Sequence, residues 1–200
     1  MECEATFDEL TASLKRCAAW LRDAEVGFVL AGSLAAWARG GPPVSGDIDF
    51  LVRPEQVERA TQALAEHGLR IEQPPESWLV KAWDEEVLVD LIHQPAGLEL
   101  EETFQRADEL SVLSVDMPVM SVDDILVNKL LSFEEHYIDF VGLLPFARSL
   151  REQADWDAVR RRTEHSAIAA GFFTMAERLG IVGSAAAPVV AEPRIRVTSA

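Results

Sequence analysis

Two aspartates, Asp47 and Asp49, stand two residues apart in the segment SGDIDFLV, which continues as an apolar strand-like run. Side chains at positions i and i+2 of a strand point to the same face of a sheet, so both carboxylates can reach one ligand. Carboxylate oxygens suit Mg²⁺, which binds proteins through few carboxylates together with substrate phosphates. The spacing therefore predicts a metal site for phosphoryl chemistry, with a pair of Mg²⁺ ions preferred and Mn²⁺ as an option.

A third carboxylate, Asp90, interrupts the apolar run VLVDLIH. Burying this acid in a strand without a metal or a partner costs several kcal/mol. We therefore expect Asp90 to join Asp47 and Asp49 as a metal ligand and to orient or deprotonate an acceptor hydroxyl. The structural alternative for Asp47 and Asp49 is a solvated strand end or a turn.

Gly32 and Ser33 follow the apolar segment 26–31 and precede a short helical pattern. Free backbone N–H groups at a helix start stabilise anions, so the pair predicts a nucleotide triphosphate site. Gly32 can equally be a turn residue and Ser33 its helix cap. Both interpretations stay open.

The elements that must position these residues alternate along the first part of the chain and are helical afterwards. The hydrophobic periodicity and the turn signals define the following ranges. Helices are expected at residues 5–25, 34–39, 54–67, 122–135, 137–152, 156–163 and 167–179, and strands at 26–31, 47–52, 69–71, 78–83, 86–92 and, in two pieces, 112–120. We expect a catalytic core over residues 1–120, a helical region over 121–182 that completes the site, and a flexible tail over 183–200.

Composition and charge narrow the class of protein. With 48% apolar and 26% charged residues the chain predicts a folded domain. No apolar run is long enough to span a membrane and the first residues are acidic, so we expect a cytoplasmic protein that does not bind membranes. Cys3 and Cys17 have no partner at metal-ligand spacing and are expected to be reduced. The net charge of −16 opposes nucleic acid and favours cationic ligands.

The order of Gly32-Ser33, Asp47-x-Asp49 and Asp90 resembles the signature of the polymerase-beta-type nucleotidyltransferase superfamily, over roughly residues 26–92. The resemblance implies an α+β fold, with a mixed sheet flanked by helices and a C-terminal helical bundle. It also implies a metal-dependent enzyme that transfers NMP from an NTP.

Residues 121–150 resemble the helical part of the AbiEii and MenT group of toxin-like nucleotidyltransferases, from type IV-like toxin–antitoxin systems. Lys129 and Asp139 match a lysine and an aspartate that complete that site, and Lys129 would neutralise the triphosphate. Ser45 resembles a serine that is phosphorylated in some MenT proteins. The resemblance implies transfer of a nucleotide, often a pyrimidine from CTP or UTP, to the 3′ end of tRNA, which blocks aminoacylation. It also implies a cognate antitoxin protein.

These two helical residues have structural alternatives as well. Lys129 can be a lysine that extends its tip to water from an apolar helix. Asp139 can be a surface acid or a partner of Arg148 or His136.

Two other functions remain open from the sequence. An antibiotic nucleotidyltransferase of the aminoglycoside type suits the charge, because residues 1–120 hold nine Lys and Arg against 23 Asp and Glu, a balance of −14. An inactive binding module of the same fold is the other.

The run Arg160-Arg161-Arg162, with Arg148 and Arg151, is the expected contact for tRNA phosphates or else a solvated helix face. Trp78 and Trp83, on either side of Lys81, could stack on a base.

Overall fold

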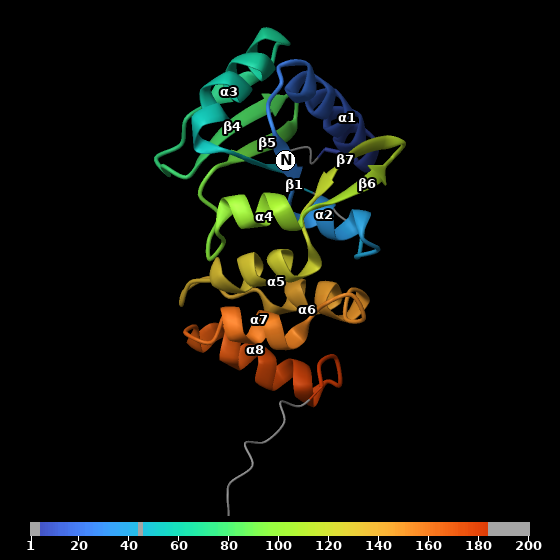
Figure 1. The fold of residues 1–200 in the computed structure, drawn as a ribbon, viewed down its shortest axis with the longest axis vertical. Coiled ribbons are helices and arrows are strands. Elements are labelled where there is room, and N and C mark those ends of the chain that lie inside the picture. Colours follow the sequence, from blue (N-terminus) through green and yellow to red (C-terminus); the bar gives the residue numbers. More distant parts are fainter. Residues whose placement is uncertain (1–4, 44–45, 184–200) are drawn as a thin grey trace, which may run out of the picture.

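The computed structural model describes residues 5–43 and 46–183. The expectations for Cys3, for Ser45 and for the tail from residue 184 onward concern residues outside these ranges. The molecule is elongated: a sheet with its helices forms one end, and a stack of C-terminal helices forms the other (Figure 1).

In the described part of the chain, seven strands form one mixed sheet in the order β3-β4-β5-β2-β1-β7-β6. The pairs β2–β5 and β1–β7 are parallel, and the other neighbours are antiparallel. Strand β1, which lies between β2 and β7, is buried along its whole length, as expected for an apolar run between two neighbours. The strands are β1 (Phe28–Leu30), β2 (Ile48–Val52), β3 (Arg70–Glu72), β4 (Leu79–Asp84), β5 (Val87–Ile92), β6 (Asp108–Val112) and β7 (Val115–Val119).

Helices α1 (Phe7–Asp23) and α3 (Val57–Glu66) lie side by side on one face of the sheet (Figure 1). A short 3-10 turn, η1 (Pro54–Gln56), leads into α3. Helix α1 begins at a capping box in which Thr6 and Glu9 exchange hydrogen bonds, and it buries an apolar stripe toward the sheet. These two helices leave the opposite face of β4, β5 and β2 free for other groups.

Helices α2 (Gly32–Ala38), α4 (Leu100–Arg106) and α5 (Val122–Leu131) connect the sheet to the C-terminal helices. The Ser121 hydroxyl caps α5 by accepting a hydrogen bond from the Asp124 amide at 3.2 Å. The Asp124 carboxylate is fully buried and is contacted by Arg106 at 3.0 Å and by Arg162 at 2.5 Å. This network ties α4 and α5 to α7.

The remaining helices are α6 (Phe140–Ser149), α7 (Trp156–Arg162) and α8 (Ala167–Arg178). Their core is aromatic: Phe140 packs on Phe172, which packs on Phe173, with ring centroids 5.7 Å apart in both pairs. None of the helices in the described ranges has both the length and the apolar character needed to cross a membrane.

The structure confirms the expected fold class, a mixed sheet flanked by helices with a helical C-terminal region. Three parts of the fold differ from the expectation. Helix α4 was not predicted, because its N-cap Glu99 makes no side-chain cap and Thr103 is its one buried residue, so neither a cap signal nor an apolar stripe marks it. Strand β6 begins at Asp108 rather than in the expected range 112–120, and the expected helix 122–135 ends at Leu131, before a loop closed by a bridge between Glu134 and Tyr137.

Candidate active site

The three aspartates come together on the face of the sheet opposite α1 and α3. The parallel register of β2 and β5 pairs Asp49 directly with Asp90, and Asp47 precedes β2 by one residue. One carboxylate oxygen of each acid lies within 4.8 Å of the other two. The structure therefore groups the three acids that the sequence singled out.

The donor set of this cluster fits a divalent cation. All three ligands are carboxylate oxygens, which Mg²⁺ and Mn²⁺ accept, and ligands of one such ion lie roughly 3–4 Å apart. Gly32 lies directly against one of these three ligands, the Asp49 carboxylate. A Cβ atom added at Gly32 would lie 1.8 Å from Oδ2 of Asp49. The Asp49 carboxylate can therefore occupy its position because Gly32 has no side chain.

The charges of the cluster act on one another. Burial, then Asp47 and Asp90, raise the pKa of Asp49 to about 7, although Lys129 and Lys81 oppose the shift. Burial also raises the pKa of Asp90, against the effect of Lys81. A cation at the cluster would favour the ionised form of both acids.

Lys81 contacts the cluster directly, and the sequence analysis gave it no role. Its ammonium donates to Oδ1 and Oδ2 of Asp90 at 3.2 and 3.3 Å. The antiparallel register of β4 and β5 places the two residues opposite each other. The signal in the sequence was that Lys81 and Asp90 lie at equal distances from the two-residue turn Glu85-Glu86.

Gly32 is the first residue of α2 and has a φ of +61°, which a residue with a side chain rarely adopts. The N-cap is Ala31, so the interpretation of Ser33 as the helix cap is wrong. Gly32, Asp49 and Lys129 face one cavity of about 130 Å³. Its other lining residues are Ala31, Leu51, Ile92, Met120, Ile125, Asn128 and Ser132.

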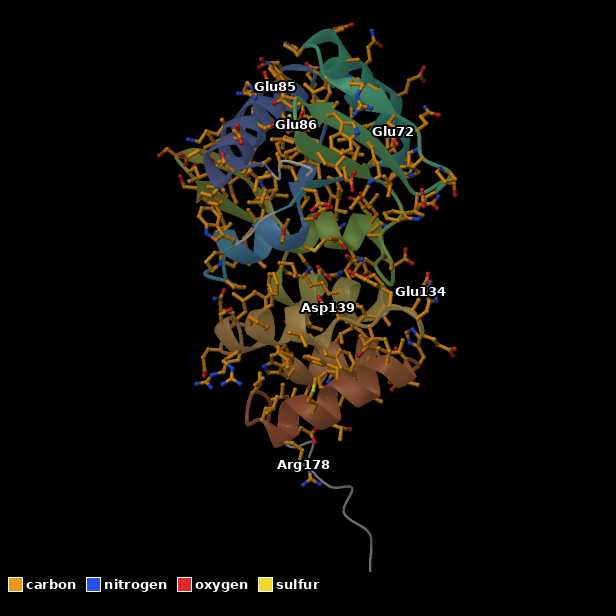
Figure 2. All side chains as sticks on the ribbon, turned by 180° about the vertical axis from the view of Figure 1, so that it is seen from behind. Glu72, Glu85, Glu86, Glu134, Asp139 and Arg178 are labelled. Carbon is orange, nitrogen blue, oxygen red and sulfur yellow. The ribbon has the colours of Figure 1, made fainter. Side chains whose placement is uncertain are left out.

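Lys129 lies between this cavity and a second one of about 230 Å³, which it shares with Asp139. Its ammonium lies 4.8 Å from the centre of the Phe146 ring. Asp139 caps α6 by accepting a hydrogen bond from the Gly142 amide at 2.7 Å. Asp139 and Glu134 lie where the sheet region meets the helical region (Figure 2). Asp139 is thus near Lys129 but outside the acidic cluster.

The expected ion pairs of Asp139 do not form within the part of the chain that the structure describes. His136 contacts Glu134 at 3.1 Å instead, and Arg148 is exposed. The structural alternative that paired Asp139 with either residue is therefore wrong.

A third cavity, of about 500 Å³, lies beside the acidic cluster and shares Ile92, Asn128 and Ser132 with the cavity that holds Asp49. Trp78 lines it with 41% of its surface exposed, and Glu134 also lines it. Trp83 is engaged elsewhere, because its indole N–H donates to Glu72 at 3.1 Å. Of the two tryptophans considered for stacking, Trp78 alone lines this space.

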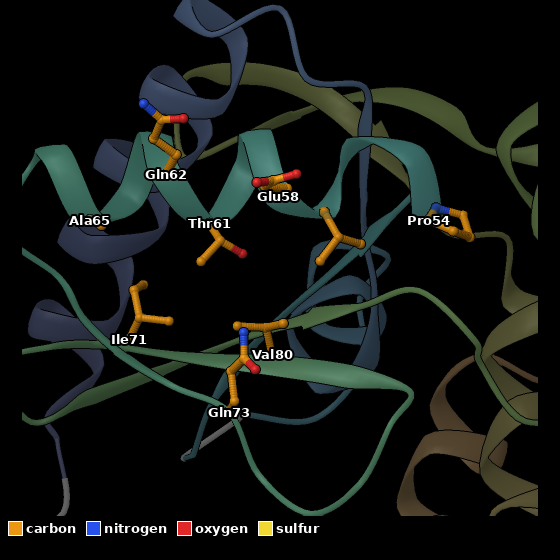
Figure 3. Close-up of a pocket in the computed structure, with 9 residues that line it drawn as sticks. Pro54, Glu58, Thr61, Gln62, Ala65, Ile71, Gln73 and Val80 are labelled. Atoms are coloured by element: carbon orange, nitrogen blue, oxygen red, sulfur yellow. The ribbon is translucent and has the colours of Figure 1, made fainter.

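The largest of these cavities, about 610 Å³, lies elsewhere, between α3 and the strands β3 and β4 (Figure 3). Val80 lines it, and alternation along β4 puts Val80 and Lys81 on opposite faces of the sheet. The cavity therefore lies across the sheet from the three aspartates, and only Glu58 contributes a charge to its lining.

Two of the three arginines in the run 160–162 contact acidic residues of the protein itself. Arg162 contacts the buried Asp124, and Arg160 contacts Glu177 at 2.6 Å and the Phe173 ring at 4.1 Å. Arg161 and Arg148 are exposed. Fewer arginines of this run are therefore available to contact tRNA phosphates than the sequence predicted.

Comparison with protein families gives one match. The model of a family described as uncharacterised nucleotidyltransferase matches residues 44–180, which include the three aspartates, Lys81, Lys129 and Asp139. A search of curated proteins found no match.

Solved structures share the fold at low sequence identity. ANT(2″)-Ia in complex with adenylyl-2″-tobramycin is 14% identical, with a TM-score of 0.61, and the match covers 82% of this chain and 97% of that one. The lincosamide antibiotic adenylyltransferase LnuA, bound to lincomycin, is 15% identical, with a TM-score of 0.52 over 72% and 96% of the two chains. A protein from Thermotoga maritima described as a candidate nucleotidyltransferase, TM1012, is 17% identical, with a TM-score of 0.50 over 74% and 94%. At these identities the likeness concerns the fold.

Proposed function

The chain belongs to the uncharacterised nucleotidyltransferase family, and on this basis we propose that its acidic cluster transfers NMP from an NTP to a hydroxyl group of an acceptor. The observation that carries the proposal is the convergence of Asp47, Asp49 and Asp90 to within 4.8 Å on one face of the sheet. A group of three acids costs free energy through mutual repulsion, and a bound divalent cation would offset this cost.

Asp47, Asp49 and Asp90 would hold Mg²⁺ or Mn²⁺. When bound there, the metal supplies positive charge to the triphosphate. Asp90 orients the acceptor hydroxyl and takes its proton. The hydroxyl oxygen then bonds to the α-phosphorus, the bond from that phosphorus to the bridging oxygen breaks, and pyrophosphate leaves.

The nucleotide would occupy the cavity that Gly32, Asp49 and Lys129 line, with Ser33 beside it. Lys129 would neutralise the triphosphate as a point charge on a flexible stem. The neighbouring cavity of Lys129 and Asp139 contains Phe133, Tyr137 and Phe146 and suits an aromatic base, and the resemblance to the MenT group implies that this base is a pyrimidine.

The acceptor would then enter from the cavity lined by Trp78 and Glu134. Among the residues that the structure describes, Glu134 is the one charged residue of its lining, and together with the −14 balance of residues 1–120 it favours a small cationic acceptor over a polyanion. Two fold relatives carry antibiotic ligands in their structures, ANT(2″)-Ia an adenylylated tobramycin and LnuA lincomycin. An amine-bearing antibiotic is therefore the first acceptor to test.

The 3′ end of tRNA is the second candidate, and an exposed apolar strip favours it. Tyr137, Ile138 and Val141 are 67%, 46% and 82% exposed beside the cavity of Lys129, where a terminal base could stack. Arg148 is exposed on the same helix as Val141 and could contact a phosphate. A cognate antitoxin would cover the same strip.

The deciding experiment measures transfer of label from each of the four α-labelled NTPs with Mg²⁺, using total tRNA in one set of reactions and tobramycin in another. The control is the double variant Asp47→Ala/Asp49→Ala. Label on one acceptor class with the wild-type protein alone supports the reaction and identifies that acceptor. An inactive binding module of the same fold would bind NTP and label neither acceptor.

A further inference from the structure

Lys81 is the cation that contacts the acidic cluster among the residues the structure describes, and strand pairing determines its position. The registers of β4–β5 and β5–β2 align Lys81, Asp90 and Asp49 in one row across three strands. The ammonium contacts both oxygens of Asp90, so a cation bound to either oxygen would lie beside a second positive charge.

We propose that Lys81 is a positioning residue that competes with a divalent cation for Asp90. In the metal-free protein Lys81 pairs with Asp90 and offsets the repulsion among the three acids. When the cation binds, Lys81 releases Asp90. The proposal rests on the proposed function, because it presumes a metal site at Asp47, Asp49 and Asp90.

The two partners differ in their freedom to move. The Lys81 side chain is 26% exposed and has a flexible four-carbon stem, whereas the Asp90 side chain is 10% exposed and is short. The ammonium can therefore swing toward solvent while the carboxylate stays in place. Two cations cannot share the same carboxylate oxygens without repulsion, so the exchange opposes cation binding.

A purely structural ion pair leads to a different expectation. If Lys81 only supported Asp90, its removal would leave the acid misplaced and would weaken cation binding. If Lys81 competes, its removal strengthens cation binding. The sign of the change in affinity therefore separates the two roles.

The test is a Mn²⁺ titration of the protein at pH 8 without nucleotide, with free Mn²⁺ followed by electron paramagnetic resonance. We expect Lys81→Met to bind Mn²⁺ roughly tenfold more tightly than wild type, the fold-change that corresponds to about 1.4 kcal/mol. Lys81→Arg keeps the charge and should show no gain. Lys15→Met is the matched control, because Lys15 is exposed on α1 and its loss also removes one positive charge. Lys81→Gln replaces Lys81→Met if the latter does not fold.

The outcomes separate the two hypotheses. If folded Lys81→Met binds Mn²⁺ with unchanged or weaker affinity while the wild type binds Mn²⁺, the proposed role of Lys81 is wrong. The proposed metal site is not affected by that result. If Lys15→Met shows the same gain in Mn²⁺ affinity, the proposed role of Lys81 is wrong as well. Absence of Mn²⁺ binding in every variant, with and without NTP, overturns the proposed metal site and the role of Lys81 together.

Discussion

Substitution of Gly32 by alanine should disable the acidic cluster while the fold survives. The new Cβ would lie 1.8 Å from Oδ2 and 2.7 Å from Cγ of Asp49, whereas real contacts of this kind are at least 3.0 Å. The carboxylate must therefore retreat by more than 1 Å. It is the end of a short side chain, so it can rotate away at little cost in folding free energy.

The magnitude follows from two separate effects. A side chain at a φ of +61° costs roughly 1–2 kcal/mol of stability. A displacement of about 1 Å in a group that holds the reacting atoms costs on the order of 100-fold in rate. Gly32→Ala should thus lose one or two kcal/mol of stability and at least about 100-fold in kcat/KM, with weaker Mn²⁺ binding.

Gly180→Ala is a matched control. Gly180 has a φ of +65°, and a Cβ there meets nothing within 4 Å. It should lose similar stability in urea denaturation and keep its Mn²⁺ affinity and its labelled-nucleotide transfer. If both variants retain the same transfer rate, the contact between Gly32 and Asp49 does not position the carboxylate, and the reasoning fails.

Three further outcomes are expected. Burial, together with Asp47 and Asp90, raises the pKa of Asp49 to about 7 in the folded protein, above its ordinary value of 3.8, so the native state binds this proton more tightly than the unfolded chain. In EDTA the wild-type protein should therefore lose stability relative to Asp49→Asn as pH rises from about 4 to about 7. If the urea midpoints of the two proteins differ by the same amount throughout this pH range, the raised pKa of Asp49 is contradicted. Asp124→Ala should cost about 3 kcal/mol in urea denaturation, because it leaves two arginines without their buried carboxylate; a loss below about 1 kcal/mol would show that water replaces it. Thr6→Ala should lower the stability by about 1 kcal/mol through the cap of α1, with no change in Mn²⁺ affinity.

The local parts of the fold could be predicted from the sequence. Apolar runs marked β1, β2, β4 and β5, and the acids that interrupt β2 and β5 marked the site. Helix α4 was missed because it has no side-chain cap and buries only Thr103, and the start of β6 was missed because Asp108 and Glu109 make the beginning of this edge strand polar.

The contacts that link distant residues could not be predicted in the same way. The partner of Lys81 depends on the pairing of two strands, and periodicity describes each strand separately. Arg162 was considered for binding tRNA, but its partner Asp124 lies 38 residues earlier in the chain. A charged residue in a sequence shows what it can bind, and the fold determines which partner it meets.

The turn between β4 and β5 has a consequence for insertions and deletions. Glu85 and Glu86 form this turn at the far end of the sheet region from Asp139 and Glu134 (Figure 2), and Glu85 has a φ of +57°. One residue added or removed here would slide β4 against β5 and turn Lys81 toward α1 and α3. Asp90 would then face an apolar neighbour. The length of the hairpin is therefore part of how the site is built.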